Sequence, residues 1–181
     1  MKNHLIISLL ILSVGFSQQE YNSNDITEMD NGLWTEKFSD KPITGKVYGY
    51  FGEVKPYKKV YMGNLLNGKK EGRWKNYYHS TGKKSEDFNF KNGKEVGLFT
   101  EWYYNGQKEY ERPFKDGNKD GLYTHWYVSG QKRVEGTYKD GKKDGKWTKW
   151  YENGQKIKEE NYKDGKLISK KEWNEDGSVK E

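Results

Sequence analysis

Residues 145–168 read GKWTKWYENGQKIKEENYKDGKLI, and the same pattern occurs three times upstream. A glycine opens each copy, at positions 72, 97, 121 and 145, and three aromatic residues follow within the next six positions. The starts lie 25, 24 and 24 residues apart. A fixed period of this length is the signature of a repeat architecture in which each unit packs on its neighbours.

Two glycine-containing turn sequences divide every copy, in the last copy Asn153-Gly154 and Asp164-Gly165. Asn-Gly and Asp-Gly between short aromatic or β-branched runs favour type I′ hairpins, because both central residues adopt positive φ. Such a two-residue turn at Asn153-Gly154 would pair Tyr151 with Lys156, Trp150 with Ile157, and Thr148 with Glu159. We therefore predict an all-β fold, an elongated single-layer antiparallel meander of β-hairpin repeats of about 24 residues.

The composition favours aromatic instead of aliphatic packing. Leu, Ile, Val and Phe account for only 32 of 181 residues, and 33% of the residues are charged, which is typical of disordered chains. However, Trp, Tyr and Phe together contribute 29 residues, and these rings bury large areas and fit pleated strands. This balance argues against an ordinary layered α/β enzyme.

The first residues have the features of a secretory signal peptide. Lys2 precedes an apolar run from Leu5 to Phe16, and Gly15 and Ser17 are small residues of the kind found at cleavage sites. We expect residues 1–17 to be removed, with an uncleaved anchor as the alternative, and the protein to be periplasmic, in the cell envelope or secreted. Because the sequence contains no Cys, disulfides, lipid attachment to a thiol and thiolate metal sites are excluded.

The remaining chain divides into an array with atypical ends. We predict a flexible segment over 18–33, degenerate N-terminal repeats over 34–71, and a truncated C-terminal cap repeat over 169–181. Four full repeats lie between these ends, at 72–96, 97–120, 121–144 and 145–168.

The repeated segments resemble a known family. The sequences WYENGQK at 150–156 and YKDGKKDG at 138–145 are similar to the MORN repeat variant. The resemblance implies a long single-layer sheet of hairpins. It also implies roles in scaffolding, dimerisation, membrane association or, in some bacterial proteins, neutralisation of a toxin, and it implies no catalytic residues.

Period-two alternation sorts the side chains onto two faces. One face collects three aromatic residues per repeat, for example Trp147, Tyr151 and Tyr162, and we interpret it as the packed side. The other face carries one aromatic residue per repeat beside Thr and an acidic column, and these residues are Tyr77, Trp102, Trp126 and Trp150. That column either fills space between repeats or forms a binding surface for a sugar ring or an apolar strip of a partner.

Lysines at the turns form a second candidate surface. Lys115, Lys139 and Lys163 recur along one edge of the sheet, where they could attract anionic headgroups or glycans or simply keep the edge solvated. The strands carry a separate basic column of Lys84, Lys108, Lys132 and Lys156. An acidic column three residues on, at Asp87, Glu111, Glu135 and Glu159, interleaves with it, so the continuous basic stripe that nucleic acid requires is missing.

Catalytic and metal-binding patterns are not found. His125 occupies a position that is Asn76, Glu101 or Lys149 in the other repeats, and no nucleophile triad or calcium-loop spacing occurs. We therefore expect no enzyme activity, cofactor or metal.

The leading hypothesis is an exported repeat scaffold that binds another protein. The alternatives are glycan or lipid-headgroup binding, an antitoxin or immunity-like role, and pairing of two copies through a sheet edge or face.

Overall fold

The computed structural model describes residues 19–52 and 55–180, and these residues contain strands and no helix. None of them therefore forms a helix that could span a membrane. The predicted signal peptide at 1–17 lies outside the described residues. The strands are β1 (Glu20–Asn22), β2 (Ile26–Glu28), β3 (Trp34–Glu36), β4 (Gly45–Phe51), β5 (Lys58–Leu66), β6 (Lys69–Tyr77), β7 (Lys84–Lys91), β8 (Lys94–Trp102), β9 (Lys108–Lys115), β10 (Asn118–Lys119), β11 (Gly121–Trp126), β12 (Lys132–Lys139), β13 (Lys142–Trp150), β14 (Lys156–Lys163) and β15 (Lys166–Glu172).

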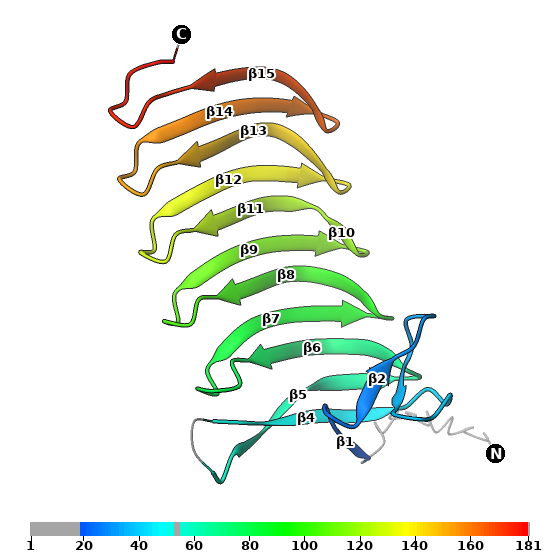
Figure 1. Ribbon diagram of the computed structural model, residues 1–181. Coiled ribbons are helices and arrows are strands. Elements are labelled where there is room, and N and C mark those ends of the chain that lie inside the picture. The colour runs from blue at the N-terminus through cyan, green and yellow to red at the C-terminus, as the bar shows by residue number, and fades with distance from the viewer. Residues whose placement is uncertain (1–18, 53–54, 181) are drawn as a thin grey trace, which may run out of the picture.

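Thirteen of these strands form one sheet in nearly sequential order (Figure 1). From β4 to β15 each strand pairs antiparallel with the next, and the short β10 pairs with β9 beside β11. The exception is β1, which pairs parallel with β4 at the first edge. The predicted all-β meander of hairpin repeats is confirmed, and it is an open, single-layer ladder whose strands arch along their length.

The Asp-Gly turns have the predicted type I′ conformation. Asp116, Asp140 and Asp164 have φ between 48° and 50°, and the glycine that follows each one also has positive φ. Asn92-Gly93 adopts the same conformation. At these turns the flanking residues pair directly, as Lys139 does with Lys142.

The Asn-Gly turns at the opposite edge differ from the prediction. At Asn153-Gly154 only Gly154 has positive φ, and the amide of Tyr151 donates to the carbonyl of Gln155 across a three-residue loop. Trp150 therefore pairs with Lys156 at a bulge, so the predicted pairings of Tyr151 and Trp150 are wrong, whereas Thr148 does pair with Glu159. The Asn153 Oδ1 accepts a hydrogen bond from the Gln155 amide at 2.9 Å, which stabilises this loop.

The N-terminal segment is ordered where the sequence predicted flexibility. Of the predicted flexible residues 18–33, those from 19 onward include β1 and β2, and Tyr21 and Ile26 are buried. We predicted degenerate repeats of the ladder over 34–71, but Trp34–Glu36 is not part of the ladder, because β3 pairs with β2 in a separate sheet. The physical reason is long-range packing, since this segment lies against the first hairpins of the ladder (Figure 1).

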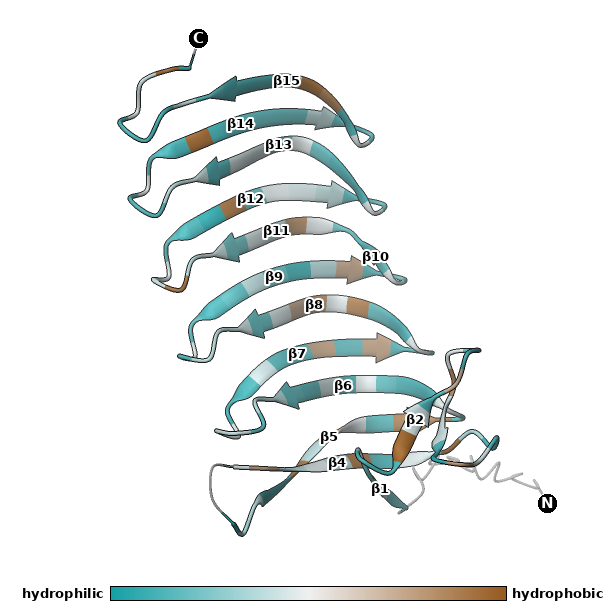
Figure 2. Cartoon of the chain, viewed as in Figure 1, coloured by the Kyte–Doolittle hydropathy of each residue, from teal (hydrophilic) through white to brown (hydrophobic). Residues whose placement is uncertain are grey.

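Two faces of the ladder follow from the observed register. We call the face that carries Trp74, Phe99, Tyr123 and Trp147 the ring face, and the face that carries Trp102, Trp126 and Trp150 the tryptophan face. At its N-terminal end the ring face is covered by Ile26 and Ile43, which belong to the same buried cluster as Trp74 and Phe88. Most of the remaining ladder is hydrophilic, with isolated apolar positions in successive strands (Figure 2).

Candidate binding groove on the ring face

The predicted tryptophan column lies on one face of the sheet, as expected. Trp102, Trp126 and Trp150 are half-buried, and no pair of these rings is in contact. Lysines from the preceding hairpin occupy the space between repeats, with the Lys84 ammonium 4.0 Å from the Trp102 ring centre and that of Lys108 5.9 Å from Trp126. Lysine–ring contacts thus hold Trp102 and Trp126 in the sheet. Tyr77 contacts the ring of Phe51, with 5.3 Å between the ring centres.

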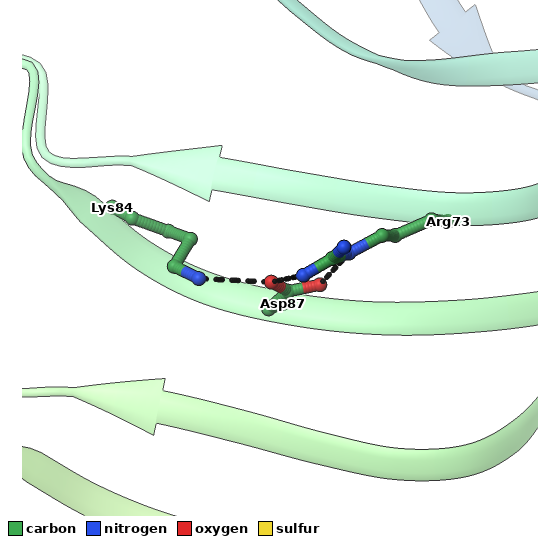
Figure 3. Close-up of polar contacts among 3 residues, drawn as sticks. All are labelled: Arg73, Lys84 and Asp87. Carbon is green, nitrogen blue, oxygen red and sulfur yellow. Dashed lines mark hydrogen bonds and ion pairs between the residues drawn. The ribbon is translucent and has the colours of Figure 1, made fainter.

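The charges of the tryptophan face are largely paired with one another. Figure 3 shows Asp87 accepting two hydrogen bonds from the Arg73 guanidinium, at 2.8 and 2.6 Å, and one from Lys84 at 2.9 Å. The hydrogen bonds from Arg73, which outweigh the opposing effect of burial, lower the pKa of Asp87 to about 2. The same Lys-to-acid pairing, three residues apart, recurs at Lys108–Glu111, Lys132–Glu135 and Lys156–Glu159.

The predicted lysines lie along the edge formed by the type I′ turns. Lys115, Lys139 and Lys163 are all exposed. Lysine lies opposite lysine at three of these turns, Lys91 with Lys94, Lys139 with Lys142, and Lys163 with Lys166. Like charges in directly opposed positions destabilise a hairpin, so repeated positive charge at this edge has a cost in stability. Lys163 also lies 3.6 Å from the Asp144 carboxylate.

A wide hollow lies on the ring face, which the sequence led us to interpret as packed. It is an open groove of about 810 Å³ lined by side chains of β8 to β14. Aromatic rings build one part of it: Tyr123 stacks on Trp147 with 5.6 Å between the ring centres, and Tyr138 meets the same indole edge-on at 4.9 Å. Burial raises the pKa of Tyr123 to about 12, so its hydroxyl remains a neutral hydrogen-bonding group.

His125 and Arg112 lie together in a second part of the groove. The imidazole stacks on Tyr110 at 4.1 Å, and the Arg112 guanidinium lies 4.5 Å from the same ring. Burial, together with the charges of Arg133, Arg112 and Lys149, lowers the pKa of His125 to about 4. His125 Nε2 and Arg112 Nε are buried without a hydrogen-bond partner in the described part of the chain.

Positive charge predominates around this groove. Six basic residues line it against three acidic ones, Glu101, Glu109 and Glu160. Arg112 pairs with Glu101 and Lys158 with Glu160. No carboxylate of the described residues lies within 4.0 Å of the charged groups of the four other basic residues, which are Lys119, Arg133, Lys143 and Lys149. The groove can therefore accept aromatic or aliphatic groups beside anionic ones.

Sequence reasoning missed this groove because alternation assigns residues to a face without showing whether another segment covers it. One signal was available, since Gly136 interrupts a strand at a position held by Phe88, Arg112 and Glu160 in the other repeats. An interior strand glycine often marks a close approach. A Cβ atom at Gly136 would lie 2.1 Å from the Trp147 indole, so the absence of a side chain at this position leaves room for that ring.

Comparison with known families agrees with this repeat geometry. Three consecutive segments, residues 95–116, 119–140 and 143–164, match the family model described as the MORN repeat variant. Residues 95–164 thus contain three consecutive segments that are similar to MORN-variant repeats. Each MORN-variant unit contains one hairpin of the ladder, β8–β9, β10–β12 or β13–β14. Residues 72–94 of the predicted repeat at 72–96 lie outside the match, although β6 and β7 form the equivalent hairpin.

The MORN-variant match indicates a repeat scaffold for interaction with proteins or membranes, a type of module that is generally not enzymatic. No curated protein matches the chain. The described residues contain no group of three or more His, Cys, Asp or Glu side chains placed to hold a metal ion.

Proposed function

We propose that this chain is an exported, non-enzymatic scaffold that binds another protein of the cell envelope or outside the cell. The observation that carries the proposal is the open ladder: in Figure 1 no second layer lies over β9 to β15, and the ring face there forms a groove. An open sheet with aromatic side chains and unpaired cations on one face is typical of a surface that binds a partner, and not of a hydrophobic core.

The test is a pull-down with the full chain, produced in its own cells with a C-terminal tag, followed by mass spectrometry of the retained proteins. Recovery of one protein in stoichiometric amount is the expected result. Retention of wall fragments or lipid without a protein would contradict the proposal. A triple substitution of Trp102, Trp126 and Trp150 to Ala then asks whether the tryptophan face takes part, which is one of the two interpretations that the sequence left open.

Binding to an anionic surface is the second candidate function. The opposed lysine pairs at the type I′ turns favour it, because they place repeated positive charge on one edge at a cost to hairpin stability. Sedimentation with vesicles that contain about 30% anionic lipid would test it. Replacing Lys115, Lys139 and Lys163 with Gln should reduce sedimentation, whereas the three tryptophan substitutions should not.

A further inference from the structure

The ring face contains the same structural niche twice, 73 residues apart. The covered niche consists of Gly63, Asn64, Lys70 and Trp74, and the open niche consists of Gly136, Thr137, Lys143 and Trp147. In each, the indole lies over the glycine, where a Cβ atom would approach it to 2.3 or 2.1 Å. In each, the indole Nε1 donates to a strand carbonyl at 3.1 Å. The lysine ammonium lies 5.2 Å from the ring centre in the first niche and 4.4 Å in the second.

The chain itself shows what the covered niche accepts. Ile26 and Ile43 are buried in one cluster with Trp74, and Trp34 packs against this cluster. The Lys70 ammonium lies 5.3 Å from the Trp34 ring as well, so it is held between the ladder and the covering segment. Burial lowers the pKa of Lys70, and among the charges that oppose this shift the carboxylate of Glu28 acts most strongly. The covering segment thus supplies apolar side chains together with an acidic group.

The net charge of the covering segment fits the same description. Residues 24–44 contain five acidic and two basic residues, a net charge of −3. The groove that contains Lys143 and Trp147 has six basic and three acidic lining residues, a net charge of +3. Charge complementarity therefore favours an acidic, partly apolar segment in the open niche as well.

The groove around the open niche also has polar groups without a charged or hydrogen-bonding partner. Lys119 and Lys143 have no carboxylate partner within 4.0 Å in the described part of the chain. His125 is 7% exposed, and its Nε2 and the nearby Arg112 Nε are both buried and unpaired there. Buried polar atoms without a partner are uncommon in folded proteins, and both of these belong to residues that line the groove.

We propose that the open groove docks an extended, acidic segment of a partner protein, as the N-terminal segment covers the equivalent niche. An aliphatic or aromatic side chain of the partner packs against Tyr123 and Tyr138, and its carboxylates meet Lys119 and Lys143. This inference rests on the proposed scaffold function and assigns it a surface and a class of ligand.

A synthetic peptide of residues 24–44 is the probe, and its binding to the full chain is measured by fluorescence anisotropy. Saturable 1:1 binding is expected. Lys143→Glu and Lys119→Glu should each weaken binding at least about tenfold, since each replaces an attraction by a repulsion. The matched control is Lys142→Glu, which makes the same charge change at the neighbouring exposed residue outside the groove. Melting curves of all variants verify that they are folded.

Three outcomes would overturn the inference: no saturable binding, equal binding to the parent and Lys143→Glu, or equal weakening by Lys142→Glu. If the peptide still binds after Ile26 and Trp34 are replaced by Ser, and is displaced by an acidic polysaccharide, the ligand of the groove is a polyanion and not a protein segment. Self-association of the chain that Lys143→Glu abolishes would make a second copy the occupant.

The same Lys143→Glu variant separates this inference from the scaffold function. If parent and variant retain one partner equally in the pull-down, the scaffold function stands and the groove is not its site. If the parent retains no protein, the scaffold function itself fails, whatever the peptide does.

Discussion

The hydroxyl of Tyr127 donates a hydrogen bond to the main-chain carbonyl of Trp150, which lies 2.8 Å away and one repeat further along the ladder. The same bond joins Tyr78 to Trp102 at 2.6 Å and Tyr103 to Trp126 at 2.7 Å. At the last repeat the distance from Tyr151 to the Trp173 carbonyl increases to 3.5 Å. These bonds connect each turn at this edge to the next hairpin.

Replacing Tyr127 with Phe should lower the free energy of unfolding by about 1 kcal/mol, because the partly buried Trp150 carbonyl loses its donor. Tyr103→Phe should cost a similar amount. Tyr151→Phe is the matched control and should cost less, since its bond is long. Urea unfolding followed by circular dichroism measures all three. Equal effects at Tyr127 and Tyr151 would contradict a role for the hydroxyl.

Substitution of Gly136 with Ala should destabilise the protein by roughly 2–3 kcal/mol, because the new methyl group meets the Trp147 indole. The control is the same substitution in a Trp147→Ala background, where the ring is absent and the cost should nearly vanish. Denaturant unfolding of the four proteins in this cycle gives the coupling between the two sites. Additive effects would show that the glycine does not seat the ring.

Stability should fall as the pH is lowered from 6.5 to about 4, because His125 resists protonation in the folded protein and accepts a proton in the unfolded chain. The loss from this residue is at most about 3 kcal/mol. His125→Asn, which introduces the residue found at position 76, should flatten the profile in this window. Thermal melting of parent and variant at several pH values tests this, and parallel profiles would exclude His125 as the cause.

Asp87 acts in a separate and lower pH window. Its folded-state pKa of about 2 lies below the unfolded value of 3.8, so its contribution is fully present above pH 3.8 and is lost as the pH falls through 2. Asp87→Asn should therefore cost about 1–2 kcal/mol at neutral pH, discounted because the Arg73 side chain is largely exposed. Glu111→Gln, at the equivalent position with one lysine partner, should cost less. The reverse order in urea unfolding would contradict this reading of Figure 3.

The repeat ladder could be predicted from sequence because its determinants are local. Asp140-Gly141 requires positive φ at both residues, and the 24-residue period places the same requirement in every unit. Asn153-Gly154 was harder, since Asn-Gly also fits a three-residue loop in which only the glycine has positive φ. Local sequence alone does not choose between the two.

The N-terminal cover and the groove could not be predicted because they depend on contacts distant in sequence. Ile26 belongs to no repeat, and its burial against Trp74 follows only from the folded chain. The same limitation hid the open niche: alternation places Tyr123 and Trp147 on one face, but only the structure shows that the face is covered at Trp74 and open further along.

The ladder also measures length. Because each hairpin bonds only to its neighbours, adding or deleting one 24-residue unit between the two niches would leave both intact and change only their separation. Six strand steps separate β6 from β13, which corresponds to about 29 Å at the usual strand spacing. The number of repeats therefore sets the distance of the open niche from the covered N-terminal end, in steps of about 10 Å per repeat.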